Sequence, residues 1–206
     1  MIDLFVGKKS KEIETQEKKQ GFSEMLSLKI IKKEEDFKIL KSSDKQDYDA
    51  CLIQTENIGR LNVFIDKARA IFQKVIVLGT DDEINRASLE NRKTFGLLNP
   101  EIGREKDYMS YKNSGLNHVL CKIAAQNNKT IFISVDELRN PQSLGRVIQN
   151  LKLCKKFKVR CQLVNLADDL SIIRSAFELK EIERVLMKGE HFEHAQKSSI
   201  FGVPKT

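Results

Sequence analysis

The chain has 206 residues, 40% of them hydrophobic and 32% charged, which is typical of a folded globular protein that buries a core. The net charge of +7 favours a polyanionic partner but does not fix the fold. No apolar run approaches the ~20 residues of a membrane span, and the N-terminal Met-Ile-Asp-Leu-Phe-Val lacks the basic start of a signal peptide. We therefore expect a cytoplasmic protein with no membrane partner.

Short apolar runs alternate along the chain with segments of helical periodicity. The runs are rich in Ile, Val, Leu and Phe on both faces, as in parallel strands that are buried on both sides. The expected strands are Ile2–Val6, Met25–Ile31, Ala50–Gln54, Lys74–Leu78, Phe95–Leu98, Thr130–Val135 and Arg160–Asn165.

Three of the intervening segments carry an apolar stripe at helical spacing. The stripes are Leu61, Phe64, Ile65, Ala68, Ile71 and Phe72; then Leu116, Val119, Leu120, Ile123 and Ala124; then Leu144, Val147, Ile148, Leu151 and Cys154. Asn127-Asn128 is suited to a left-handed helix end after the second stripe. About seven parallel strands alternating with helices predict an α/β fold, either a small (β/α) barrel or a doubly wound open sheet. We expect a single domain over residues 1–188 and a disordered C-terminal tail over residues 189–206.

The carboxylates that follow the predicted strands are the candidates for chemistry, because sites in parallel α/β folds lie at the carboxyl ends of strands. Glu101, Asp136 and Asp168 would be the ligands if the chain were a metal-dependent phosphoesterase. The alternative is that these acids, together with Asp81, Asp82, Glu83, Glu137 and Asp169, cap helices or lie in their first turns, since nearly all directly precede one. The chain has no P-loop, no Ser-His-Asp spacing and no Cys-x-x-Cys pair. We therefore expect no catalytic residue, metal site or bound cofactor in this chain.

Cations are concentrated in one stretch of the chain. Residues 138–165 contain seven cations and no acid, namely Arg139, Arg146, Lys152, Lys155, Lys156, Lys158 and Arg160. The apolar stripe in this stretch places Arg146, Gln149, Asn150, Lys152, Lys155 and Lys156 on the outer faces of the predicted helix. A face that only promotes solubility usually mixes charges, so the absence of acids favours binding of an anion. A second group of cations is Arg86, Arg92, Lys93, Arg104 and Lys106.

Four pieces of sequence occur in a fixed order between residues 85 and 157. They are Asn85-Arg86 with Glu90-Asn91; Pro100-Glu101 with Arg104 and Asp107; Gly115-Leu116-Asn117-His118-Val119; and Leu144-Gly145-Arg146 with Gln149-Asn150 and Leu153-Cys154-Lys155-Lys156-Phe157. In this order the pieces resemble protein component 3 of archaeal ribonuclease P, the family that includes the thirty-kilodalton subunit of the eukaryotic enzyme. After the last predicted strand the chain has Asn165-Leu166-Ala167 where the family usually has small residues.

The resemblance implies a (β/α) barrel of the metal-dependent phosphoesterase type, with some units trimmed. It also implies a subunit of the ribonucleoprotein that removes the 5′ leader of precursor tRNA. The expected partners are ribonuclease P RNA, precursor tRNA, protein component 2 and the other protein subunits. The chemistry and its Mg²⁺ ions would belong to the RNA. The residues expected to bind RNA are Arg86, Arg92, Arg104, Arg146, Lys155 and Lys156. Two alternatives remain, a phosphoesterase that uses Glu101, Asp136 and Asp168, and a scaffold that binds only protein.

Overall fold

The computed structural model of the chain describes residues 1–40, 44–104, 106, 107, 109 and 111–188. Seven parallel strands form one sheet in chain order from β1 to β7. The strands are β1 (Ile2–Val6), β2 (Glu24–Ile31), β3 (Ala50–Ile53), β4 (Lys74–Leu78), β5 (Gly96–Leu98), β6 (Thr130–Ser134) and β7 (Arg160–Val164). All seven predicted strands are present, and no end differs from its prediction by more than one residue.

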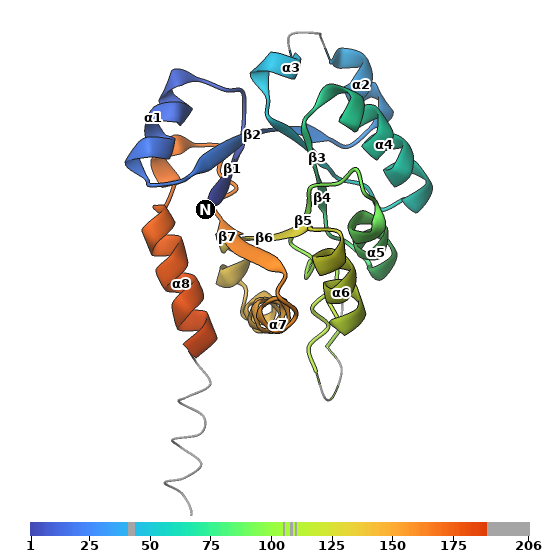
Figure 1. Ribbon diagram of the computed structural model, residues 1–206, viewed down its shortest axis with the longest axis vertical. Coiled ribbons are helices and arrows are strands. Elements are labelled where there is room, and N and C mark those ends of the chain that lie inside the picture. Colours follow the sequence, from blue (N-terminus) through green and yellow to red (C-terminus); the bar gives the residue numbers. More distant parts are fainter. Residues whose placement is uncertain (41–43, 105, 108, 110, 189–206) are drawn as a thin grey trace, which may run out of the picture.

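Helices cover the outside of the curved sheet, as Figure 1 shows. They are α1 (Lys11–Lys19), α2 (Glu34–Ile39), α3 (Asp44–Asp47), α4 (Ile58–Ile71), α5 (Asp82–Glu90), α6 (His118–Gln126), α7 (Pro141–Phe157) and α8 (Ala176–Lys188), with 3₁₀ turns at Val135–Arg139 and Leu170–Ile172. Asn128 has a φ of 52°, so the left-handed conformation predicted after α6 is confirmed.

The first and last strands meet along a seam that closes the barrel. Phe5 and Ala167 form a parallel bridge just beyond the end of β7. Beside it the buried carboxylate of Asp3 accepts hydrogen bonds of 2.7 Å from both the backbone N–H and the side-chain amide of Asn165. The expected (β/α) barrel of about seven strands is therefore confirmed, and the open-sheet alternative is wrong.

The strand side chains form two separate apolar cores. Inside the barrel nine buried residues pack together: Leu4, Leu26, Leu28, Ala50, Leu52, Ile76, Leu98, Phe132 and Val164. Residues that alternate with these pack outward against the helices, where Leu61, Phe64, Ile65 and Ala68 of the first predicted stripe are buried. The barrel interior is thus filled by side chains, which leaves its ends and its outer surface for binding.

In the part of the chain that the structure describes, no helix is both long and apolar enough to cross a membrane. All four cysteines are free thiols, and three of them are buried. The predicted tail, residues 189–206, lies outside the described residues.

Candidate nucleic-acid interface

The long segment between β5 and α6, residues 99–117, is held against the barrel by buried side chains of the neighbouring helices. On one side Asn85 of α5 is fully buried, and its side-chain amide donates to the carbonyl oxygens of Pro100 (3.0 Å) and Gly115 (3.2 Å). The oxygen of the same amide accepts from the backbone N–H of Thr80, at 3.3 Å. One side chain therefore joins the loop after β4 to both ends of the 99–117 segment.

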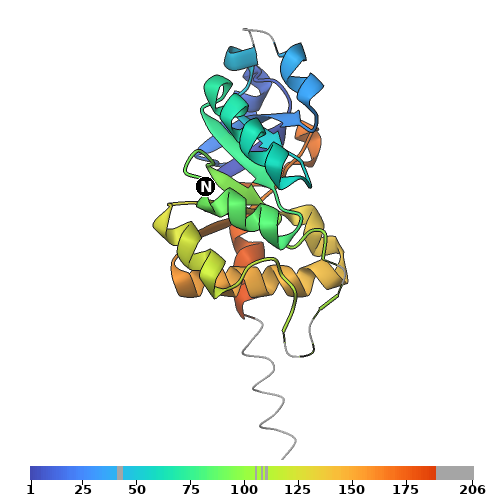
Figure 2. The ribbon, with the colours of Figure 1, turned by 90° about the vertical axis from the view of Figure 1, so that its right-hand side faces the viewer.

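On the other side α7 presents polar side chains to this segment, and Figure 2 shows the segment running beside that helix. The amide of Asn150 donates to the carbonyl oxygen of Ser114 (2.9 Å) and to the carboxyl group of Glu101 (3.1 Å). The guanidinium of Arg146 donates to the carboxylate of Asp107 and to the carbonyl oxygen of Arg104, both at 2.9 Å.

The placement of Arg146 and Asn150 on the outer faces of the helix was therefore wrong. Both residues are buried, with exposures of 5% and 0%. Their polar groups replace water as hydrogen-bond partners of a loop whose described residues form no helix or strand. Apolar periodicity cannot reveal this arrangement, because it assigns polar residues to solvent.

Arg104 is also committed to internal contacts. Its guanidinium forms an ion pair of 2.6 Å with Asp82 in the first turn of α5, and its side chain is only 5% exposed. Burial of the Arg104 and Arg146 side chains leaves little of either guanidinium for a phosphate in this conformation. That these two arginines bind RNA directly stays a prediction, and the geometry favours a role in holding the 99–117 segment.

The carboxylates proposed as metal ligands are not arranged as a site. Glu101 is buried, and loss of water contact raises the pKa of its carboxyl group to about 8. Asp136 and Asp168 are exposed, and Asp136 faces Arg139 at 3.5 Å. Among the described residues no group of three His, Cys, Asp or Glu side chains could hold a metal ion.

The capping interpretation of the acidic residues is confirmed at two positions and wrong at Glu101. Asp81 accepts from the N–H of Ile84 at the start of α5, and Asp169 accepts from the N–H of Ser171. Glu101 caps no helix and instead lies beneath the 99–117 segment, where it accepts from Asn150.

The remaining predicted RNA-binding residues are exposed. Arg86 lies on α5 and forms a surface ion pair with Glu90. Arg92 lies in the turn between α5 and β5, and Lys155 and Lys156 lie in the last turn of α7. These last three therefore lie toward the amino-terminal ends of the strands, whereas Arg104 lies at the carboxyl ends. The structure does not bring the six residues into one site.

Further cations surround Lys155 and Lys156. Lys158 and Arg160 are exposed where α7 passes into β7. On the adjacent α8, Lys180, Arg184 and Lys188 follow one another every four residues, so they share a helical face. This α8 group was not predicted, although its regular spacing is visible in the sequence. Lys155 of α7 lines one groove together with Lys180, Arg184 and Lys188 of α8. Cations of two helices thus meet at one basic surface, which a polyanion fits.

Comparison with known proteins gives relatives of one kind. Ribonuclease P protein component 3 of Methanococcoides burtonii is 30% identical over 149 residues, which is 68% of this chain and 58% of the relative. The same-named protein of Methanosarcina mazei is 33% identical over 129 residues, 60% of this chain and 51% of the relative. The chain is similar to ribonuclease P protein component 3. The resemblance inferred from the four sequence pieces is confirmed.

The similarity to component 3 proteins covers only part of their length. The chain spans about half to three fifths of the length of the curated component 3 proteins it matches, and no family model matches it. A chain in a cryo-EM structure of archaeal ribonuclease P with mature tRNA superposes with a TM-score of 0.67 at 21% identity, covering 97% of this chain and 88% of that one. At that identity the match supports the shared barrel fold.

Five of the residues that carry the resemblance have a common structural task. Asn85, Glu101, Arg104, Asp107 and Gly115 all contact or belong to the 99–117 segment. Gly115 has a φ of 74°, and an added Cβ there would lie 1.8 Å from the carbonyl oxygen of Pro100. The most specific sequence pieces are therefore those that fix this segment on the barrel.

Proposed function

We propose that the chain is a protein subunit of ribonuclease P, the ribonucleoprotein that removes the 5′ leader of precursor tRNA. In this role it supports the catalytic RNA together with protein component 2 and does not carry the chemistry itself. The observation that carries the proposal is the similarity to component 3 proteins over about two thirds of the chain. The barrel supports it further, because Arg86, Arg92, Lys155 and Lys156 are exposed on its surface.

The charge of the barrel surface suits a structural RNA. Lys155, Lys156, Lys158 and Arg160 are exposed within one short stretch that contains no acid. Contacts of this kind neutralise phosphates, and each contact contributes a slope of about −0.7 to −0.9 to the dependence of log affinity on log salt. A subunit that neutralises RNA in this way lowers the amount of free Mg²⁺ that the RNA needs for folding.

Mg²⁺ is expected at the active site of the RNA, where it would activate the attacking water and stabilise the leaving oxygen. The residues of this chain do not fit such a site, because Glu101 is buried, Asp136 and Asp168 are exposed, and no group of three such side chains among the described residues could hold a metal ion. We accordingly assign no step of the reaction to these carboxylates.

The proposed partners are ribonuclease P RNA, precursor tRNA, protein component 2 and the other protein subunits, and the proposed location is the cytoplasm. Four free cysteines support a reducing compartment, since disulfides are rare there.

Reconstitution tests the proposal. Ribonuclease P RNA is assayed for precursor-tRNA cleavage at low Mg²⁺, alone, with component 2, and with component 2 plus this chain. We expect cleavage only with both proteins and a loss of activity in the double variant Lys155→Ala/Lys156→Ala. The control is Lys38→Ala, which removes one positive charge from the distant α2, and this variant should keep activity. Cleavage that does not depend on this chain would overturn the proposal.

A further inference from the structure

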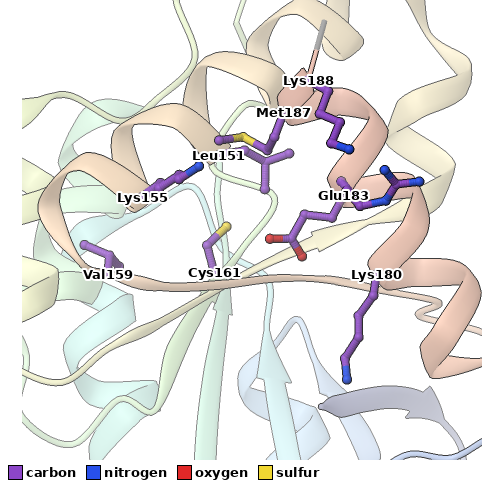
Figure 3. A pocket seen from close by; sticks show the side chains of 9 residues that line it. Leu151, Lys155, Val159, Cys161, Lys180, Glu183, Met187 and Lys188 are labelled. Atoms are coloured by element: carbon purple, nitrogen blue, oxygen red, sulfur yellow. The ribbon is translucent and has the colours of Figure 1, made fainter.

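A groove lies outside the barrel between the last turns of α7, the start of β7 and the last turns of α8 (Figure 3). Its volume is about 670 Å³, within the range of roughly 300–1,000 Å³ that is usual for sites that bind small molecules. Leu151, Val159 and Met187 supply an apolar floor. An apolar group therefore fits against this floor.

The rim of the groove is cationic. Lys155 comes from α7, and Lys180 and Lys188 come from α8. None of these three ammonium groups has an ion-pair partner among the described residues, whereas Arg184 is neutralised by Glu181 at 2.6 Å. Three free positive charges over an apolar floor favour a ligand that has both an anionic and an apolar part.

One carboxylate distinguishes this groove from a simple phosphate site. Glu183 points into it beside Cys161, as Figure 3 shows. Glu183 is the one carboxylate among the groove residues, and burial raises its pKa. A carboxylate accepts hydrogen bonds and repels phosphate, so its natural counterpart is a group with adjacent N–H donors. The Watson–Crick edge of guanine presents two such donors side by side, whereas uracil has one N–H between two carbonyl oxygens.

We propose that this groove binds one unpaired nucleotide of an RNA, with the base on the floor, its N–H edge at Glu183 and its phosphates at Lys155, Lys180 and Lys188. Guanine is the preferred base. This inference rests on the proposed function and adds a contact at which the subunit recognises one base of its RNA. An unpaired nucleotide is required because single-stranded bases expose their edges, whereas a duplex hides them. An acidic peptide fits less well, since its carboxylates would face Glu183.

Cys161 provides a direct test of occupancy. It is the partly exposed cysteine of this chain, and Cys51, Cys121 and Cys154 are buried. The full chain is treated with iodoacetamide alone, with a uridine heptamer, and with a uridine heptamer that has one central guanosine. We expect the guanosine oligomer to slow alkylation of Cys161 several-fold and to bind about ten-fold more tightly than the uridine oligomer, as expected for hydrogen bonds to a charged group.

Variants test the assigned roles. Glu183→Gln should remove most of the preference for guanosine, and Lys180→Ala should weaken both oligomers, whereas the control Lys38→Ala should change neither. The methyl resonance of Met187 gives a second readout that does not depend on thiol reactivity, and it should shift on addition of the guanosine oligomer.

The outcomes separate this inference from the proposed function. If Cys161 and Met187 do not respond to RNA while the chain still activates ribonuclease P RNA, the groove assignment is wrong and the subunit role stands. If hexaglutamate protects Cys161 as well as the guanosine oligomer does, the groove binds an acidic protein segment and the nucleotide assignment is wrong. If the chain neither binds nor activates ribonuclease P RNA, the proposed function itself fails.

Discussion

Replacing Asn85 with alanine should release the 99–117 segment from the barrel. The side chain is fully buried and makes three hydrogen bonds, to Pro100, Gly115 and Thr80. Truncation leaves the carbonyl oxygen of Gly115 and the N–H of Thr80 without this partner, and it leaves the carbonyl oxygen of Pro100 with only a long bond of 3.5 Å from Arg104. Each lost partner costs about 1–3 kcal/mol. Because two of the three bonds are long, at 3.2 and 3.3 Å, we expect values near the lower end and a total loss of about 3–5 kcal/mol.

The assay is urea unfolding of Asn85→Ala, combined with amide hydrogen exchange of the 99–117 segment. Exchange at the N–H groups of Ile102 and Ser114, which are bonded within the segment, should become faster before global unfolding does. Asn62→Ala is the matched control, because Asn62 is exposed and makes one long bond of 3.3 Å. Its effect should stay within about 0.5 kcal/mol. A loss below about 1 kcal/mol for Asn85→Ala, with unchanged exchange, would refute the reasoning.

Three further predictions concern a glycine, a buried acid and the basic surface. Gly115→Ala should lower the melting temperature more than Gly21→Ala, because both have a positive φ but only at Gly115 does an added Cβ meet backbone. Burial raises the pKa of Glu101 from 4.5 to about 8, so the folded state keeps a proton that the unfolded state loses. The free energy of unfolding should therefore fall between pH 4.5 and 8, by up to about 1.4 kcal/mol per pH unit, and urea unfolding of Glu101→Gln should show a flatter profile. Lys155→Ala and Lys156→Ala should each weaken binding to ribonuclease P RNA. Where a phosphate contact is lost, the slope of log affinity against log salt should become shallower by about 0.7–0.9. Filter binding at several salt concentrations measures this slope, and unchanged slopes would contradict the prediction.

The strands were predictable because each is a short apolar run. Burial on both faces requires an apolar residue at nearly every position of a strand, and such runs are visible in the sequence. Closure of the barrel was not predictable in the same way, since it depends on Asp3 and Asn165, polar residues far apart in sequence. The same reason explains the error at Arg146 and Asn150. Their hydrogen-bond partners are carbonyl and carboxyl groups of a distant loop, and a helical pattern contains no information about partners outside the helix.

The sequence did not reveal which of the predicted RNA-binding residues are exposed and which are buried. Arg86 and Arg104 are both arginines near acids, yet one is a surface side chain and the other is enclosed. The difference arises from the path of the 99–117 segment, which has no periodicity to reveal it. The acid-free stretch ending at residue 165 does not separate them either, because it contains the buried Arg146 as well as the exposed Lys155 and Lys156.

The seam between β1 and β7 has a consequence for the order of events during synthesis. Asp3 and Asn165 are separated by 162 residues. The carboxylate of Asp3 therefore cannot form these hydrogen bonds until the last strand has been synthesised. Until then the edge of β1 is an unpaired strand, which is a site for wrong pairing. Contacts of such long range form slowly. A nascent chain of this protein should therefore depend on chaperones most in the interval before β7 is made.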